Sequence, residues 1–168
     1  TANTLWITLI CMVGEVASAT IVAYGFARYR FPGRDAWFMV LLATMMLPGA
    51  VTLVPTFIMF KHLGWIDTYW PLTVGSFFGG GAFYIFLARQ FFLTIPTELE
   101  EAARLDGCTD WQIFTQIFLP LSKPLLVTIA VFSFTAHWKD FMGPLIYLNS
   151  PEGFTLTLGL NWFKQSIV

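Results

Sequence analysis

The chain has 168 residues, of which 57% are hydrophobic and only 11% are charged, and its formal net charge is -1. Soluble domains carry about 25% charged residues, so the composition excludes an ordinary soluble protein and indicates an integral membrane protein. The small net charge gives no basic field for nucleic acid, and we expect no nucleic-acid partner. The chain starts without methionine, and we expect residues 1–168 to be one transmembrane domain that is incomplete at both ends.

Four apolar segments are long enough to cross a bilayer, which takes about 20 residues of helix. The predicted spans are residues 5–27, 36–60, 68–88 and 124–147. The fourth is the weakest, because Lys139 and Asp140 interrupt it near its end. These segments predict an all-α fold, a polytopic transmembrane helix bundle in contact with lipid.

The distribution of lysine and arginine predicts the orientation of the spans, since short loops rich in these residues stay in the cytoplasm. Six positive residues fall on one side of the predicted bilayer and three on the other. The larger group is Arg28, Arg30, Arg34, Arg89, Arg104 and Lys123; the smaller group is Lys61, Lys139 and Lys164. Residue 1 is therefore expected outside the cytoplasm, and the charged segment before the fourth span inside it.

Several spans contain residues that disturb a regular helix. Pro48 and Pro55 lie in the second span, where each removes a backbone hydrogen bond, and Gly79 opens a run of three glycines in the third. Ordinary helix packing explains any one of these residues. Together they favour a bundle around a pathway.

Buried polar and aromatic residues supply further candidates for that pathway. Glu15 lies about ten residues into the first span, where a charge costs roughly 2.5–3.5 kcal/mol unless it is paired. It either lines the pathway or is a neutral carboxyl bonded to a neighbouring helix. The candidate pathway residues are Glu15, Pro48, Gly79, Tyr84, Trp138 and Asp140, and Trp70 is a further aromatic candidate; an aromatic belt at the membrane interface is the simpler explanation for the rings.

Residues 96–121 form a charged block between the third and fourth predicted spans. Six of the chain's charged residues lie between Glu98 and Asp110. Thr97 with Glu100 and Thr109 with Gln112 have the spacing of helix capping boxes. Gly107 is suited to the left-handed conformation that ends a helix, and Pro120 predicts the end of the second helix near Phe118. The block therefore predicts two short helices joined by a glycine corner.

The charge of this block indicates a protein partner. It carries five carboxylates and one arginine, whereas helices that lie on anionic lipid are rich in lysine and arginine. Leu99, Ala102 and Ala103 form a small apolar face, of the kind that fits a groove on another protein.

The block also resembles a known signature. The run Glu101-Ala102-Ala103, three residues, Gly107, nine residues, Ile117, one residue and Leu119-Pro120 is similar to the EAA motif of permease subunits of bacterial ABC importers. The stretches AYGFARYRFPGR, RQFFLTIPTELEEAARLDG and WKDFMGPLIYLNSP resemble the carbohydrate-uptake group that includes maltose and glycerol-phosphate permeases. One departure is Lys139, which stands in Trp138-Lys139-Asp140 where this group usually has asparagine.

The resemblance implies a type I importer permease with six spans, of which this chain would hold the second to fifth. It implies a bacterial or archaeal cytoplasmic (inner) membrane, a dimer of ATP-binding subunits, a second permease that is identical or related, and an extracytoplasmic solute-binding protein facing residues 149–160. The residues that it implies for docking the ATPase subunit are Glu101, Ala102, Ala103, Asp106, Gly107, Trp111 and Pro120.

The sequence contains no pattern for catalysis by this chain. It lacks the G-x-x-x-x-G-K-[ST] phosphate loop, and His62 and His137 have no metal-ligand spacing. We expect a non-catalytic transport subunit without a cofactor, with ATP and magnesium held by the partner. Two alternatives are an ion-coupled transporter that uses Glu15 and Asp140, and a membrane scaffold that recruits a cytoplasmic protein.

Overall fold

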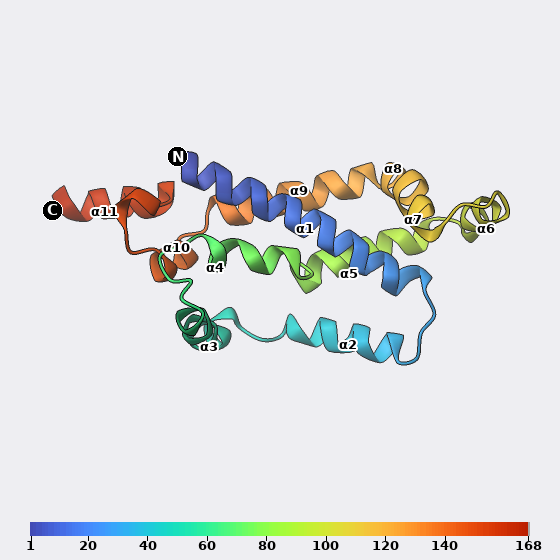
Figure 1. Ribbon diagram of the computed structural model, residues 1–168, viewed down its shortest axis with the longest axis horizontal. Helices are drawn as coiled ribbons and strands as arrows, with labels where there is room; N and C mark the ends of the chain where they lie inside the picture. Colours follow the sequence, from blue (N-terminus) through green and yellow to red (C-terminus); the bar gives the residue numbers. More distant parts are fainter. Residues whose placement is uncertain (168) are drawn as a thin grey trace.

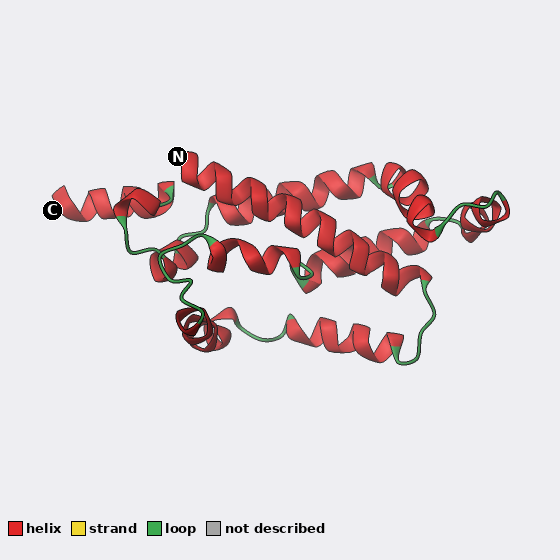
Figure 2. Cartoon of the chain, in the orientation of Figure 1, coloured by secondary structure: helices red, strands yellow, loops and turns green. Residues whose placement is uncertain are grey.

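The structure is a computed structural model that describes residues 1–167, with side chains described as far as residue 164. Helices and loops account for all of this part, and it contains no strand (Figure 2). The all-α prediction is confirmed.

Helix α1 (Ala2–Arg28) is the central element of the bundle (Figure 1). Its 27 residues span about 40 Å at about 1.5 Å per residue, which is enough to cross a hydrocarbon core. It packs against α5 (Ala82–Thr94) and α9 (Lys123–Trp138). Ala19, Ala23 and Ala88 are fully buried, and such small side chains let membrane helices approach closely.

The second predicted span is two helices rather than one. Helix α2 (Arg34–Thr44) and α3 (Gly49–His62) meet at 95°. Pro48 causes the break, because it is extended at the start of α3 and proline disfavours helix in the residue before it. Pro55 lies within α3 without ending it.

The third predicted span is interrupted at its glycine run. Helix α4 (Trp70–Thr73) continues into the 3-10 helix η1 (Val74–Phe77), and the chain then turns before α5. Gly79, Gly80 and Gly81 all have positive φ, which breaks the helical path. The apolar stretch from Trp70 to Thr94 is nevertheless long enough to cross a membrane, and it extends beyond the predicted end at residue 88.

The fourth predicted span ends earlier than residue 147. Helix α9 stops at Trp138, and the short helices α10 (Met142–Tyr147) and η3 (Pro151–Gly153) precede α11 (Leu156–Ile167). The polar pair Lys139 and Asp140 forms the turn, where the Asp140 carboxylate accepts a hydrogen bond from the Gly143 N–H at 3.2 Å.

Within residues 1–167, two helices are long and apolar enough to cross a membrane, Ala2–Arg28 and Trp70–Thr94. Two pairs of helices joined at a sharp bend could each count as one further span, which would raise the number to four. The first pair is α2 with α3. The second is the helical segment Asp110–Leu121 with α9, and these two meet at 77°.

Candidate functional site

The charged block is a two-helix unit at the end of the molecule away from both chain termini (Figure 1). Helix α6 (Thr97–Leu105) ends at Gly107, whose φ is +82°, and α7 (Asp110–Ile113) follows. The Cys108 N–H donates to the Ala103 carbonyl at 2.9 Å and the Gly107 N–H to the Arg104 carbonyl at 3.1 Å. This is the Schellman arrangement, and it confirms Gly107 as the corner between two helices.

The two predicted capping boxes have different outcomes. At α7 the box is present, because the Thr109 side chain accepts from the Gln112 N–H while the Gln112 side chain accepts from the Thr109 N–H at 2.8 Å. The capping box predicted at α6, Thr97 with Glu100, is absent. Pro96 takes the cap position with no side-chain cap, and the Glu100 carboxylate binds arginine side chains instead, which are charged and therefore stronger partners.

Pro120 does not end the second helix. After α7 the chain forms a π-helical turn, η2 (Phe114–Phe118), and then α8 (Leu119–Leu121), which contains Pro120. Proline lacks an N–H and crowds the preceding turn, and a wider π turn accommodates both effects. The bend falls after α8, at Ser122.

Arg28 joins the charged block to the membrane helices. It is the last residue of α1, and only 6% of its side chain is exposed. It donates to the carbonyl oxygen of Phe92 at 2.6 Å and to that of Ile95, at the end of α5. Its Nε lies 3.8 Å from the Glu100 carboxylate in α6, and its guanidinium carbon lies 4.7 Å from the centre of the Phe118 ring in η2. One side chain thus connects four elements.

Arg104 closes the block on itself across the glycine corner. It lies 3.0 Å from a Glu100 oxygen and 2.6 Å from an Asp110 oxygen. The hydrogen bond with Glu100, followed by the charge of Asp110, raises the pKa of Arg104. Burial and a hydrogen bond with Asp110 raise the pKa of Tyr29, which follows α1 directly. Arginine side chains therefore neutralise the charges of Glu100 and Asp110 within the block. The other three carboxylates are exposed, and they are Glu98, Glu101 and Asp106.

The predicted docking residues divide by exposure. Those that are exposed are Glu101, Ala102, Asp106, Gly107, Trp111 and Pro120. Ala103 is buried and packs in the core with Ile113 and Phe114, so it does not share the exposed face of Leu99 and Ala102 that the sequence predicts. Leu105, which the sequence did not single out, is 90% exposed beside the corner. A helical-face pattern assigns a residue to one side only, and Ala103 lies on the inner one.

Glu15 has a partner in another helix. Its carboxylate lies 3.0 Å from Nε2 of His137 in α9, and Gly80 packs so closely that a Cβ there would lie 2.9 Å from the Glu15 Cα. Of the two interpretations of Glu15, the structure therefore agrees with a carboxyl that is hydrogen-bonded to a neighbouring helix. Residue type alone could not find this pair, because 122 residues separate its members.

The other pathway candidates do not gather around one cavity. Tyr84 is half-buried and lies beside Gly81, in the same glycine turn as Gly79. Trp138 stacks on Phe134 with 5.5 Å between ring centres. Pro48 is exposed at the start of α3, and the Asp140 carboxylate accepts a hydrogen bond from the Gly143 N–H in the first turn of α10.

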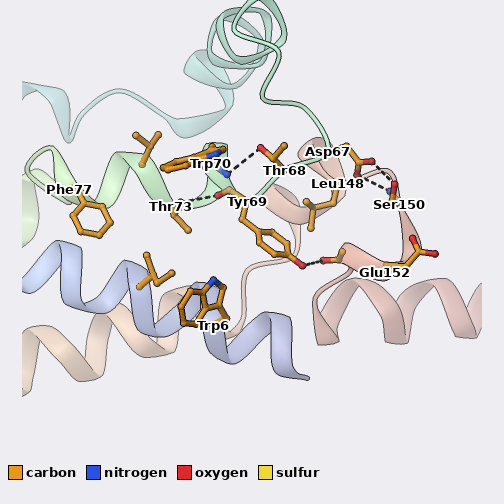
Figure 3. Close-up of a pocket in the computed structure, with 13 residues that line it drawn as sticks. Trp6, Asp67, Thr68, Tyr69, Trp70, Thr73, Phe77, Leu148, Ser150 and Glu152 are labelled. Carbon is orange, nitrogen blue, oxygen red and sulfur yellow. Dashed lines mark hydrogen bonds between the residues drawn. The ribbon is translucent and has the colours of Figure 1, made fainter.

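A cavity of about 890 Å³ lies at the opposite end of α1 from Arg28, beside the start of α4 (Figure 3). Four of its thirteen lining residues are aromatic, and Figure 3 shows that they come from α1, from α4 and the residue before it, and from η1. They are Trp6, Tyr69, Trp70 and Phe77. Of these only Trp70 was singled out from the sequence, because the cavity forms between segments that are distant along the chain.

The apolar helices and the two-helix charged block define a polytopic membrane protein of the ABC importer permease fold. Residues 16–167 match the family described as binding-protein-dependent transport system inner membrane component, and the chain belongs to this family. The resemblance drawn from the EAA motif is therefore confirmed.

Named relatives lie in transport systems for several solutes. The maltodextrin transport system permease protein MdxG of Bacillus subtilis (strain 168) is 37% identical over 162 residues, which is 96% of this chain and 58% of that protein. The sn-glycerol-3-phosphate transport system permease protein UgpE of Rhizobium meliloti (strain 1021) is 37% identical over 158 residues, 94% of this chain and 55% of that one.

A solved structure is also similar. It is the crystal structure of a bacterial ABC transporter involved in the import of the acidic polysaccharide alginate, with a TM-score of 0.86 and 29% identity, covering 99% of this chain and 57% of that chain. The chain spans slightly more than half the length of the curated relatives it matches.

Proposed function

We propose that the chain is the transmembrane permease part of an ATP-driven, binding-protein-dependent importer of sugars or related polyol derivatives. The observation that carries this proposal is the construction of the charged block. It is a helix pair fixed by the Gly107 corner and Arg104, and Arg28 connects it to α1 and α5. Such a unit can pass a displacement of its outer surface to the membrane helices.

The outer surface of the block is proposed to dock an ATPase subunit. Glu101 and Asp106 are exposed and have no ion-pair partner within the described part of the chain, and Ala102, Leu105 and Trp111 add apolar area beside them. Exposed acids around a small apolar ridge fit a groove with a basic residue. ATP and magnesium are held by that partner, and this chain is proposed to be non-catalytic and to bind no cofactor.

The remaining partners follow from the same proposal. A second permease chain, identical or related, would complete the pathway, and a solute-binding protein would approach the side that carries residue 1 and residues 149–160. The charged block would lie in the cytoplasm, and the complex in the inner membrane of a bacterium or archaeon.

Charge reversal within α6 tests the docking surface. Glu101→Arg should abolish co-purification of the ATPase subunit with the complete permease, because the proposed anchor would then repel a basic groove. Glu98→Arg is the matched control, since Glu98 is an exposed acid in the same helix. Equal loss of the ATPase in both variants, or no loss in either, would contradict docking through Glu101.

An ion-coupled transporter is the second candidate, and the observation that favours it is the pairing of the buried Glu15 with the partly buried His137. Uptake driven by a proton gradient without ATP would support this candidate and overturn the first.

A further inference from the structure

We propose that the cavity between α1, the start of α4 and the loop at residues 148–153 binds an uncharged saccharide. The inference rests on the proposed import function and deepens it, because it selects uncharged solutes over phosphorylated and acidic ones.

The size and walls of the cavity suit a sugar. Its volume of about 890 Å³ lies within the range of roughly 300–1,000 Å³ that is typical of small-molecule sites. The apolar C–H face of a sugar ring packs on aromatic rings, whose bodies are apolar while tryptophan and tyrosine also carry a polar group. Trp6 and Trp70 are each 60% exposed, so their rings are open to a ligand.

The aromatic rings are held by their neighbours. Trp70 packs on Trp65 with 6.0 Å between ring centres, and Trp65 stacks in turn on Phe60 at 5.7 Å. The Tyr69 hydroxyl donates to the Gly153 carbonyl at 3.4 Å, and this hydrogen bond links the aromatic side of the cavity to the loop at residues 148–153 (Figure 3). The Asn3 side chain donates to the Glu152 carbonyl at 2.7 Å and fixes that loop against α1. A preformed site loses less ordering entropy on binding.

Polar groups at the rim can bind sugar hydroxyls. The Glu152 side chain is exposed, and a carboxylate accepts hydrogen bonds from hydroxyl groups. The hydroxyl of Thr68 donates to the Trp65 carbonyl at 2.6 Å and retains acceptor capacity beside the cavity.

The charge of the lining separates the solute classes. Two carboxylates, Asp67 and Glu152, line the cavity, and its lining includes no lysine or arginine. The Asp67 carboxylate accepts hydrogen bonds from the N–H groups of Asn149 and Ser150 and from the Ser150 hydroxyl, and these lower its pKa, so it is anionic at neutral pH. Phosphate and uronate groups would meet like charge without a cation to pair with. Uncharged saccharides would not.

The test is direct binding to the complete permease in nanodiscs, with its ATPase and without a solute-binding protein. The probes are neutral trisaccharides of glucose, galactose and arabinose, compared with trigalacturonate and glycerol 3-phosphate. At least one neutral probe should bind at least ten times more tightly than either anion. Trp70→Ala should weaken that binding at least tenfold, and Trp70→Phe should retain most of it. Trp37→Ala is the matched control, because Trp37 is an equally exposed tryptophan in α2 that lines neither this cavity nor the docking surface.

Two further readouts separate failure of this inference from failure of the import function. Glu152→Lys should raise the affinity for trigalacturonate relative to the neutral probe. Tighter binding of an anion to the unaltered protein, or equal effects of Trp70→Ala and Trp37→Ala, would overturn the saccharide site. The saccharide site is also overturned if the preparation imports sugar with ATP but binds no probe in the cavity. That outcome is expected if lipid or another helix fills the cavity. Loss of ATP-driven uptake for every solute would instead count against the import function.

Discussion

Replacing Arg28 with alanine should separate the charged block from the membrane helices. The change removes the hydrogen bonds to the carbonyl groups of Phe92 and Ile95 and the buried contact with Glu100. Arg104 remains beside Glu100 after the substitution, so the block should keep its own fold. The predicted effect is therefore a loss of attachment rather than a loss of the helix pair.

The size of the effect follows from what is buried. A hydrogen bond to a charged group contributes about 1.5–3 kcal/mol, and removing one partner of a buried ion pair costs about 3–5 kcal/mol. These contributions overlap because one side chain makes them all, and Glu100 retains Arg104, so the expected total is about 3–5 kcal/mol. At about 1.4 kcal/mol per tenfold change, this is two to nearly four decades in a local opening equilibrium.

Hydrogen exchange of the complete complex measures this opening. Backbone amides at residues 95–105 should lose protection in Arg28→Ala, while ATP hydrolysis continues and uptake falls. Arg30→Ala is the control, since Arg30 is an exposed arginine two residues away. If the two variants exchange alike and transport alike, Arg28 does not connect the block to α1 and the reasoning is refuted.

Three other changes have defined outcomes. Gly107→Ala should destabilise the corner by about 1–2 kcal/mol through its positive φ alone, since a Cβ there meets no other atom, and an unchanged thermal unfolding midpoint would contradict this. Glu15→Ala should destabilise the bundle by about 1–3 kcal/mol by removing the hydrogen-bond partner of His137. If the effects of Glu15→Ala and His137→Ala on thermal unfolding simply add in the double variant, the pair is not coupled. Hydrogen bonds from Ser150 lower the pKa of Asp67, so this carboxylate should stabilise the loop fully above its ordinary value of 3.8 and lose that effect as pH falls through the lower folded pKa. Asp67→Asn should remove this part of the pH dependence in thermal unfolding scans, and an unchanged pH profile would exclude it.

Local signals in the sequence predicted features that depend on local chemistry. The αL corner at Gly107 and the capping box at Thr109 require only neighbouring residues, and both are present. Proline was less reliable. Pro48 breaks the second span completely, whereas Pro120 is absorbed by a π turn. A single-residue rule cannot distinguish these outcomes, because the packing of Phe114 and Phe118 in the core holds the second helix together.

Contacts between distant segments could not be predicted from residue type. Arg28 was counted only as a positive charge near the membrane, yet it is buried among carbonyl groups and Glu100. The partner of Glu15 and the walls of the aromatic cavity likewise come from segments far apart in the chain. The family resemblance identified the block, but its attachment to the bundle required the three-dimensional arrangement.

The central claim is that ATP drives import through this permease and that the charged block transmits the motion. The most direct test is uptake into proteoliposomes that contain the complete permease, its ATPase and its solute-binding protein. Uptake should require ATP and should be lost in Glu101→Arg while remaining in Glu98→Arg. Uptake that proceeds on a proton gradient alone, or that survives Glu101→Arg unchanged, would contradict the account.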